Sequence, residues 1–226
     1  MPPPPFRTSP VPRARLFLIT PREIDLEAFA PMLEEALSAG DVASLLISVE
    51  TRSPAELQRI AERLVPIAQA HDVAALVHGD SRASARARAD GLHVEEGIEA
   101  LEEAVEAHQP RLIVGAGGLR SRDEAMAAGE AGADYLLFGL LERPDDPMPH
   151  RKSLDFGRWW AEVFEPPCVV LAGSDIASVT PAAETGAEFV ALRDAVWTHP
   201  AGPAAAVREA NALLDAARTE DGDGGP

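Results

Sequence analysis

The chain has 226 residues, 46% of them hydrophobic, which is enough to bury one substantial core and fits the size of one α/β barrel. It carries 20 basic and 37 acidic residues, a formal net charge of −17. A surface this negative repels nucleic-acid backbones and anionic lipid head groups, so we expect neither nucleic acid nor a membrane as a partner. The single cysteine, Cys168, allows no internal disulfide, which favours a cytoplasmic protein.

The two ends of the chain differ in composition from its middle. Residues 1–13 are rich in proline and contain no apolar run long enough for a signal peptide or a membrane span, so we expect an extended or disordered lead-in. Residues 219–226 are acidic and glycine-rich, which predicts a solvated tail. A single domain is therefore expected over residues 14–218.

Short apolar runs alternate along the chain with longer, alanine-rich segments of helical period. The predicted strands are 15–20, 43–49, 73–78, 91–94, 111–115, 135–139, 168–172 and 188–192. The predicted helices are 25–39, 54–70, 81–88, 97–108, 121–131, 153–164, 177–185 and 202–218, with N-caps at Asp25, Ser53 and Ser121. Eight such units favour a closed (βα)₈ TIM barrel over an open sheet, which would leave units over.

Several stretches, taken in chain order, carry a resemblance to a known family. They are RLFLIT at 15–20, ADGLHV at 89–94, EAMAAGEAGADYLLFG at 124–139, FEPPCVVL at 164–171 and FVALRDAVWTHPAGPAAAV at 189–207. Over residues 15–214 the sequence resembles the thiamine phosphate synthases, particularly their proteobacterial members. The resemblance implies a (βα)₈ barrel and the joining of a pyrimidine pyrophosphate to a thiazole phosphate with Mg²⁺.

The positions that the family uses for pyrophosphate are altered here. The second strand of the family ends in glutamine, arginine and lysine at alternating positions, where this chain has Leu46, Ser48 and Glu50. A glutamate in place of a lysine exchanges attraction for repulsion, on the order of 4 kcal/mol per charge pair at ~4 Å and an effective dielectric of about 20. The resemblance therefore predicts that the pyrophosphate site is degenerate.

The magnesium ligands implied by the resemblance are also replaced. His78 and Gly79 stand where the family has asparagine and aspartate, and Ile98 stands at the second metal carboxylate. Asp80 lies one residue away and is a weak candidate for a displaced metal ligand or catalytic group. We expect no cofactor and no metal, with Mg²⁺ required only if a rearranged synthase site is active.

The anion-binding groups that remain follow strands five, seven and eight. They are expected to bind a small phosphorylated molecule through backbone amides and one guanidinium, and they are Gly117, Gly118, Gly173, Ser174 and Arg193. The glycine run at 115–118 has two interpretations: a loop whose amides bind a phosphate, or an ordinary tight turn between a strand and a helix.

Two histidines remain to be assigned. His93 matches a family histidine and is expected to be structural, with proton transfer as the weaker alternative. His78 and Asp80 are interpreted as a polar rim, with an orienter and base as the alternative.

Three functions are consistent with this pattern. The first is a barrel that has lost the synthase activity and now serves as a small-ligand or protein-binding module. The second is an enzyme, either a synthase with a rearranged site or a thiazole tautomerase, although the tautomerase histidine falls near Leu119 and Arg120. The third is a homo-oligomer or a partner for an active paralogue, which rests on analogy alone.

Overall fold

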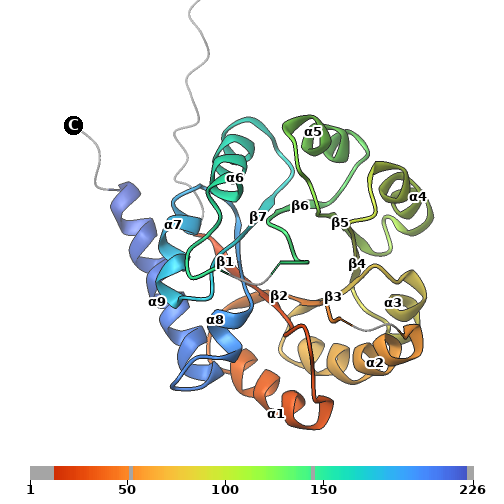
Figure 1. Cartoon of the computed structure of the whole chain (residues 1–226), viewed down its shortest axis with the longest axis horizontal. Coiled ribbons are helices and arrows are strands. Elements are labelled where there is room, and N and C mark those ends of the chain that lie inside the picture. Colours follow the sequence, from red (N-terminus) through yellow and green to blue (C-terminus); the bar gives the residue numbers. More distant parts are fainter. Residues whose placement is uncertain (1–12, 51–52, 144–145, 223–226) are drawn as a thin grey trace, which may run out of the picture.

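A computed structural model of the protein describes residues 13–50, 53–143 and 146–222, with the backbone alone for 219–222. Its strands are β1 (Arg15–Ile19), β2 (Val42–Ile47), β3 (Ala74–His78), β4 (Gly91–Val94), β5 (Ile113–Ala116), β6 (Tyr135–Phe138), β7 (Cys168–Leu171) and β8 (Phe189–Leu192). Each strand pairs in parallel with the next, and β8 pairs with β1, so the sheet closes into the ring visible in Figure 1. The predicted (βα)₈ barrel is confirmed.

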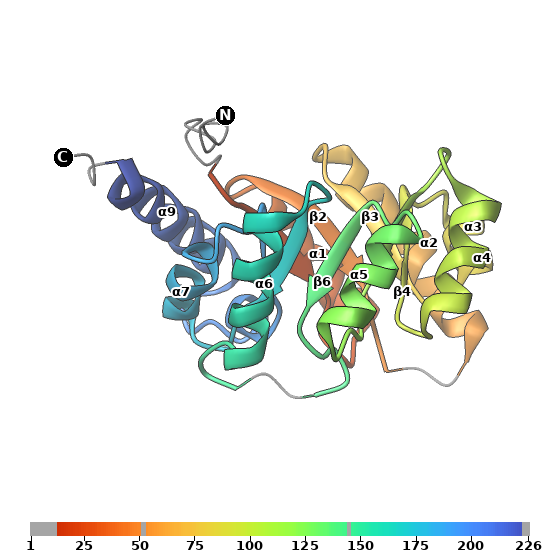
Figure 2. The same cartoon turned by 90° about the horizontal axis from the view of Figure 1, so that it is seen from above.

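Helices surround the ring on its outside. They are α1 (Leu26–Leu37), α2 (Pro54–Ala70), α3 (Ser81–Ala87), α4 (Ile98–His108), α5 (Arg122–Glu130), α6 (Arg151–Val163), the 3-10 turn η1 (Ile176–Ser178), α7 (Val179–Ala183), α8 (Asp194–Trp197) and α9 (Pro203–Gly222). The described residues that directly follow β2 and β6 lie at one edge of the barrel, the lower edge in Figure 2. None of the helices in the described part of the chain is long and apolar enough to cross a membrane.

The predicted N-caps of three helices are confirmed. Asp25 accepts hydrogen bonds from the amides of the first turn of α1, and Ser53 and Ser121 do the same for α2 and α5. These side chains satisfy amide groups that the helix itself leaves without partners, and so fix where each helix begins.

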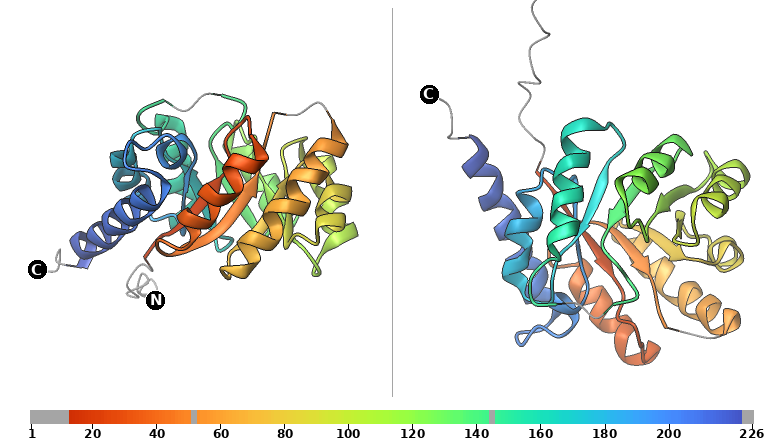
Figure 3. Two further views of the ribbon diagram at one scale, coloured as in Figure 1. Left: turned by 90° about the horizontal axis from the view of Figure 1, so that it is seen from below. Right: turned by 45° about the horizontal axis from the view of Figure 1, so that its top comes forward.

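Several boundaries differ from the prediction. The predicted helix 177–185 is a 3-10 turn followed by five helical residues, and α8 was not expected because four residues carry too little periodicity. At the C-terminus, α9 continues to Gly222, past the expected start of the tail at Thr219, and lies alongside α1 and α7 (Figure 3). Residues 223–226 lie outside the described residues.

Arg13, the last residue of the expected lead-in, contacts the barrel. Arg13 forms an ion pair with Asp41 at 3.3 Å and a second with Asp215, and its Nη2 donates to Asn211 Oδ1 at 2.7 Å. Arg13 therefore belongs to the end of the barrel opposite the βα loops. Residues 1–12 lie outside the described residues.

Two apolar layers hold the barrel together. One lies between the strands and the helices, and the other fills the inside of the barrel with side chains that include Phe17, Leu46, Leu76 and Tyr135. Tyr135 can lie across β5 only because residue 115 is glycine, since a Cβ atom there would lie 2.0 Å from its Cζ. This packing also brings the Tyr135 hydroxyl to His93 inside the barrel.

The substitution Gly115→Ala tests this packing. It should lower the free energy of unfolding by about 1–3 kcal/mol, because overpacking a filled core forces side chains off their rotamers. Urea unfolding measures the loss. Adding Tyr135→Leu to Gly115→Ala should recover part of the lost free energy of unfolding. If the changes in free energy from the two single substitutions simply add in the double variant, the contact between residues 115 and 135 is contradicted.

Candidate functional site

A chain of polar side chains runs from the mouth of the barrel, at the end of β2, into its interior, where it ends at Tyr135 of β6. The Ser48 hydroxyl lies 2.9 Å from His78 Nδ1, and His78 Nε2 lies 3.5 Å from Glu95 Oε2. Glu95 Oε1 lies 3.6 Å from His93 Nε2, and His93 Nδ1 lies 2.9 Å from the Tyr135 hydroxyl. Five residues from four strands or strand ends thus form one continuous network.

Exposure falls steadily along this network. The side chain of His78 is 25% exposed, that of Glu95 is 15% exposed, and His93 is fully buried. Within the described residues neither His93 Nε2 nor Glu95 Oε1 has a hydrogen-bond partner, and the 3.6 Å between them is too long for a hydrogen bond. Because a carboxylate only accepts hydrogen bonds, it is stable between two histidines when each carries its proton on Nε2.

The charges in the network follow from its burial and its contacts. Burial lowers the pKa of His78, with a smaller contribution from the nearby His93, so the imidazole is neutral near pH 7. Burial alone raises the pKa of Glu95, but the contacts with His93 and His78 and the Gly118 amide outweigh it, so the net pKa is lowered. Burial also raises the pKa of Tyr135. A single carboxylate is the negative charge at the centre of the network.

The glycine turn after β5 is shaped around this carboxylate. A Cβ atom at Gly117 would lie 2.5 Å from His93 Nε2 and 2.7 Å from Glu95 Oε1. Gly118 has φ of +67°, a left-handed conformation that suits glycine, and its amide donates to Glu95. The turn therefore binds a carboxylate of the chain itself in this structure.

The three altered positions of strand two lie on one face, as the two-residue period of a strand requires. Leu46 is buried inside the barrel, Ser48 joins the network at the mouth, and Glu50 pairs with Arg22 at 2.8 Å. Arg22 comes from the loop after β1, and its Nε and Nη2 atoms are buried with no partner among the described residues.

The residues considered for metal binding have other contacts. Oδ1 of Asp80 accepts hydrogen bonds from the amides of Arg82 and Ala83 and so caps α3. Gly79 donates its amide to the carbonyl of His93, and Ile98 packs against the core. Among the described residues no hydrogen bond or ion pair links His78 to Asp80. The described part of the chain also contains no group of three or more His, Cys, Asp or Glu side chains that could hold a metal ion.

The expected anion-binding groups after β7 and β8 face the chain's own backbone. The Gly173 amide donates to Ser178 Oγ, and the amides of Ser174 and Asp175 donate to the carbonyls of Asp146 and Pro147. A Cβ atom at Gly173 would lie 2.2 Å from the Pro147 oxygen. The loop between β6 and α6 thus covers this turn.

Arg193 is engaged by the same loop. Its side chain is buried, and its guanidinium donates to the carbonyls of Leu141 and Arg143 at 3.1 and 2.9 Å. In this structure Arg193 anchors the loop after β6 and does not face an open anion site.

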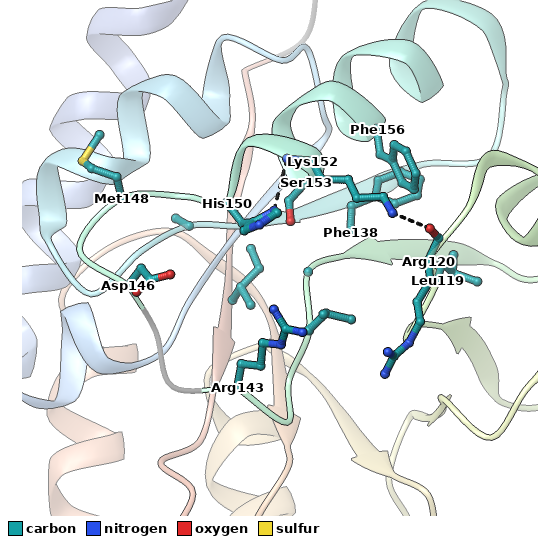
Figure 4. A pocket seen from close by; sticks show the side chains of 14 residues that line it. Leu119, Arg120, Phe138, Arg143, Asp146, Met148, His150, Lys152, Ser153 and Phe156 are labelled. Atoms are coloured by element: carbon teal, nitrogen blue, oxygen red, sulfur yellow. Dashed lines mark hydrogen bonds between the residues drawn. The ribbon is translucent and has the colours of Figure 1, made fainter.

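A pocket lies on the other side of that loop, between β5, β6, β7 and α6 (Figure 4). Its walls are mainly apolar and include Phe138, Phe156 and Leu171, while basic side chains stand at its rim. The Lys152 ammonium donates to the Arg120 carbonyl at 2.6 Å, and the Arg120 guanidinium pairs with Glu142. Within the described part of the chain no hydrogen bond or ion pair engages the Arg143 guanidinium, which points into the pocket in Figure 4.

The sequence analysis named His78 and His93 but missed how they are connected. Glu95 was not a candidate because it begins an acidic run that is typical of a solvated helix face. Arg22 and Arg143 carry no motif, and only the structure brings them to the mouth.

Comparison with known proteins decides the family. The family model for thiamine monophosphate synthase matches residues 16–196. A thiamine-phosphate synthase from Rhodospirillum centenum is 38% identical over 201 residues, which cover 88% of this chain and 97% of that protein. The chain belongs to the thiamine monophosphate synthase family.

Further relatives agree with this assignment. A thiamine-phosphate synthase from Hyphomonas neptunium is 36% identical and covers 91% of this chain and 96% of that protein. The structure of the thiamine phosphate pyrophosphorylase from Pyrococcus furiosus superposes with a TM-score of 0.74 at 24% identity, covering 91% of this chain and 97% of that one. The resemblance found in the sequence is confirmed, and the chain belongs to a family of thiamine biosynthesis.

The stability of the protein should fall on acidification because of this network. The folded pKa of His78 lies below its ordinary value of 6.5 and that of Glu95 lies below 4.5, so the unfolded chain binds more protons below about pH 6.5. Urea unfolding between pH 5 and 8 should show a smaller pH dependence for His78→Gln than for the wild type. His71→Gln, at the end of α2, is the matched control, and equal slopes for the wild type and His78→Gln would contradict the assignment.

Proposed function

We propose that this family member does not carry out the pyrophosphate-releasing synthase reaction and instead binds a small phosphorylated ring compound at the mouth of its barrel. One observation carries the proposal: the carboxylate of Glu95 lies against the glycine turn after β5, 3.5 Å from His78 Nε2 and 3.6 Å from His93 Nε2. Gly117 leaves room for this carboxylate, since a Cβ atom there would lie 2.7 Å from Glu95 Oε1.

Charge supports the first half of the proposal. A departing pyrophosphate needs several positive charges to stabilise it. The groups near the end of β2 include two carboxylates, those of Glu95 and Glu50, which repel a pyrophosphate. The nearby Arg22 already forms an ion pair with Glu50 through one guanidinium nitrogen. Repulsion by one carboxylate, on the order of 4 kcal/mol at ~4 Å and a dielectric of about 20, outweighs one charge-assisted hydrogen bond of roughly 1.5–3 kcal/mol.

Magnesium does not fit the residues present. It requires several hard oxygen ligands in near-octahedral order. Asp80 uses one carboxylate oxygen to cap α3, and Ile98 at the second ligand position is apolar. We therefore propose that the chain works without a metal cofactor.

The second half of the proposal concerns the pocket between β6, β7 and α6. The turn after β7 and Arg193 are engaged by the loop after β6, so the expected phosphate site at Gly173, Ser174 and Arg193 would require that loop to move. The pocket already combines apolar walls with the Arg143 guanidinium. These two features suit an aromatic ring that carries a phosphate group.

The first prediction is the absence of synthase turnover. Purified protein supplied with both family substrates and Mg²⁺ should form no thiamine phosphate above background, with the Rhodospirillum centenum relative as the positive control. Steady turnover that Asp80→Ala or Ser48→Ala abolishes would contradict the proposal.

The second prediction concerns binding in the pocket. Thiazole phosphate should bind with high-micromolar to millimolar affinity, because about one charge-assisted contact is available. Arg143→Gln should weaken binding by about tenfold, which corresponds to ~1.4 kcal/mol, while the exposed Arg151→Gln should leave it unchanged. Titration followed by backbone amide shifts measures both the affinity and the site. Shifts that cluster around Gly173 and Ser174, with no effect of Arg143→Gln, would place the phosphate at the turn after β7.

An active synthase with a rearranged site is the second candidate, favoured by the two relatives named as synthases at 38% and 36% identity. The turnover assay separates the two candidates. A thiazole tautomerase is less well supported, because Leu119 and Arg120 stand near the position expected for its histidine. A partnership with an active paralogue rests on analogy alone. We also infer a cytoplasmic location, which the single buried Cys168 favours.

A further inference from the structure

Three side chains at the strand-two side of the mouth stand in the order hydroxyl, imidazole, carboxylate. Ser48 Oγ lies 2.9 Å from His78 Nδ1, and His78 Nε2 lies 3.5 Å from Glu95 Oε2. The backbone of Ser48 is fixed on both sides, because its amide donates to Thr20 Oγ1 at 3.0 Å and its carbonyl accepts from the same hydroxyl at 3.1 Å. The serine is thus held in place at the point where β2 ends.

The protons in this arrangement can be assigned from the chemistry of the groups. The Glu95 carboxylate 3.5 Å from Nε2 favours the tautomer in which His78 carries its proton on Nε2 and leaves a lone pair on Nδ1. The Ser48 hydroxyl then donates to that lone pair. A hydroxyl within hydrogen-bonding distance of a neutral base, with the base oriented by a third group, is the arrangement that activates a nucleophile.

The two ring nitrogens of His78 exchange the roles they have in serine proteases. Here the hydroxyl faces Nδ1 and the carboxylate faces Nε2, whereas in serine proteases the hydroxyl faces Nε2 and the carboxylate faces Nδ1. Both ring nitrogens can accept or donate, so the chemistry is the same. The Ser48–His78 end is also the more open part of the network, since the His78 side chain is 25% exposed and Ser48 is half-buried. A small molecule at the mouth can therefore reach the serine.

We propose that Ser48 is a nucleophile toward small uncharged acyl esters, with His78 as its general base and Glu95 as the positioning residue. The hydroxyl oxygen would form a bond to the acyl carbon while the ester C–O bond breaks. The proton passes from Oγ to His78 Nδ1 and on to the departing alcohol. A water molecule then cleaves the acyl-serine, giving a carboxylic acid and restoring the hydroxyl.

The surroundings define the class of substrate. Glu95 lies next to the base, and the Glu96 carboxylate, which accepts from the Glu95 amide, lies beside it. These charges repel anionic substrates and so favour neutral ones. This activity is independent of the ligand proposed for the pocket at β6 and β7, because it uses the opposite side of the mouth.

In this proposal the Arg22 guanidinium would stabilise the negative charge that develops on the acyl oxygen. Its loop is joined to the end of β2, since the Glu50 amide donates to the Arg22 carbonyl at 2.7 Å and the guanidinium pairs with Glu50. Nε and Nη2 of Arg22 are buried without a partner among the described residues, although a buried guanidinium is stabilised by hydrogen bonds. An acyl oxygen would supply the missing acceptor.

The proposal is tested with two probes on the full chain. A fluorophosphonate should label the wild-type protein on Ser48, as located by peptide mass mapping, and p-nitrophenyl acetate should be hydrolysed. Ser48→Ala should abolish the label, and His78→Gln should slow it on the order of 100-fold, a typical contribution of a general base. Ser44→Ala on the same strand and His71→Gln on α2 are the matched controls and should label as the wild type does.

The role of Glu95 is distinguished from simple folding by conservative variants. Glu95→Asp should retain more labelling than Glu95→Gln, and Arg22→Lys more than Arg22→Gln, in samples whose circular dichroism matches the wild type. A folded wild-type protein that is not labelled on Ser48 overturns the proposal, even if Ser48→Ala fails to fold. Equal labelling rates for the wild type and His78→Gln would overturn it as well.

Discussion

The mouth of this barrel is organised around one carboxylate, that of Glu95, held between two imidazoles and the amide of a glycine turn. A carboxylate that is 15% exposed is stable only when donors surround it, because desolvation of an unpaired charge costs several kcal/mol. Several other positions follow from this requirement. Gly117 must lack a side chain, Gly115 must admit Tyr135 so that its hydroxyl meets His93, and His78 must turn its other nitrogen toward Ser48.

The remaining half of the mouth is shaped by the loop between β6 and α6. Arg193 holds this loop through two carbonyls, and the loop in turn covers the amides after β7. The groups that the sequence suggested for an anion are thus engaged within the chain. The pocket beside Arg143 stays open, and the two proposals therefore place different chemistry in the two halves of the mouth: neutral molecules near Ser48 and an anionic ring compound near Arg143.

The fold could be predicted from the sequence because alternation and hydrophobic period report directly on strands and helices, and the caps at Asp25, Ser53 and Ser121 mark where helices begin. The site could be predicted only in part. His78 and His93 stand at strand ends and were named for that reason, whereas Glu95 was hidden in an acidic run. Arg193 was expected to face a phosphate, but an arginine can donate equally well to backbone carbonyls, and which partner it meets depends on a loop conformation that no local pattern encodes.

The account rests on the Glu95 carboxylate lying between the two histidines, and a long-range ¹H–¹⁵N correlation spectrum of the imidazole nitrogens at pH 7 tests this most directly. We expect both rings to carry a proton on the Nε2 atom that faces Glu95, and both signals to change in Glu95→Gln, because the side-chain amide presents its NH2 group to one of the two rings. A proton on Nδ1 of either ring, or signals unaffected by Glu95→Gln, would contradict the central arrangement.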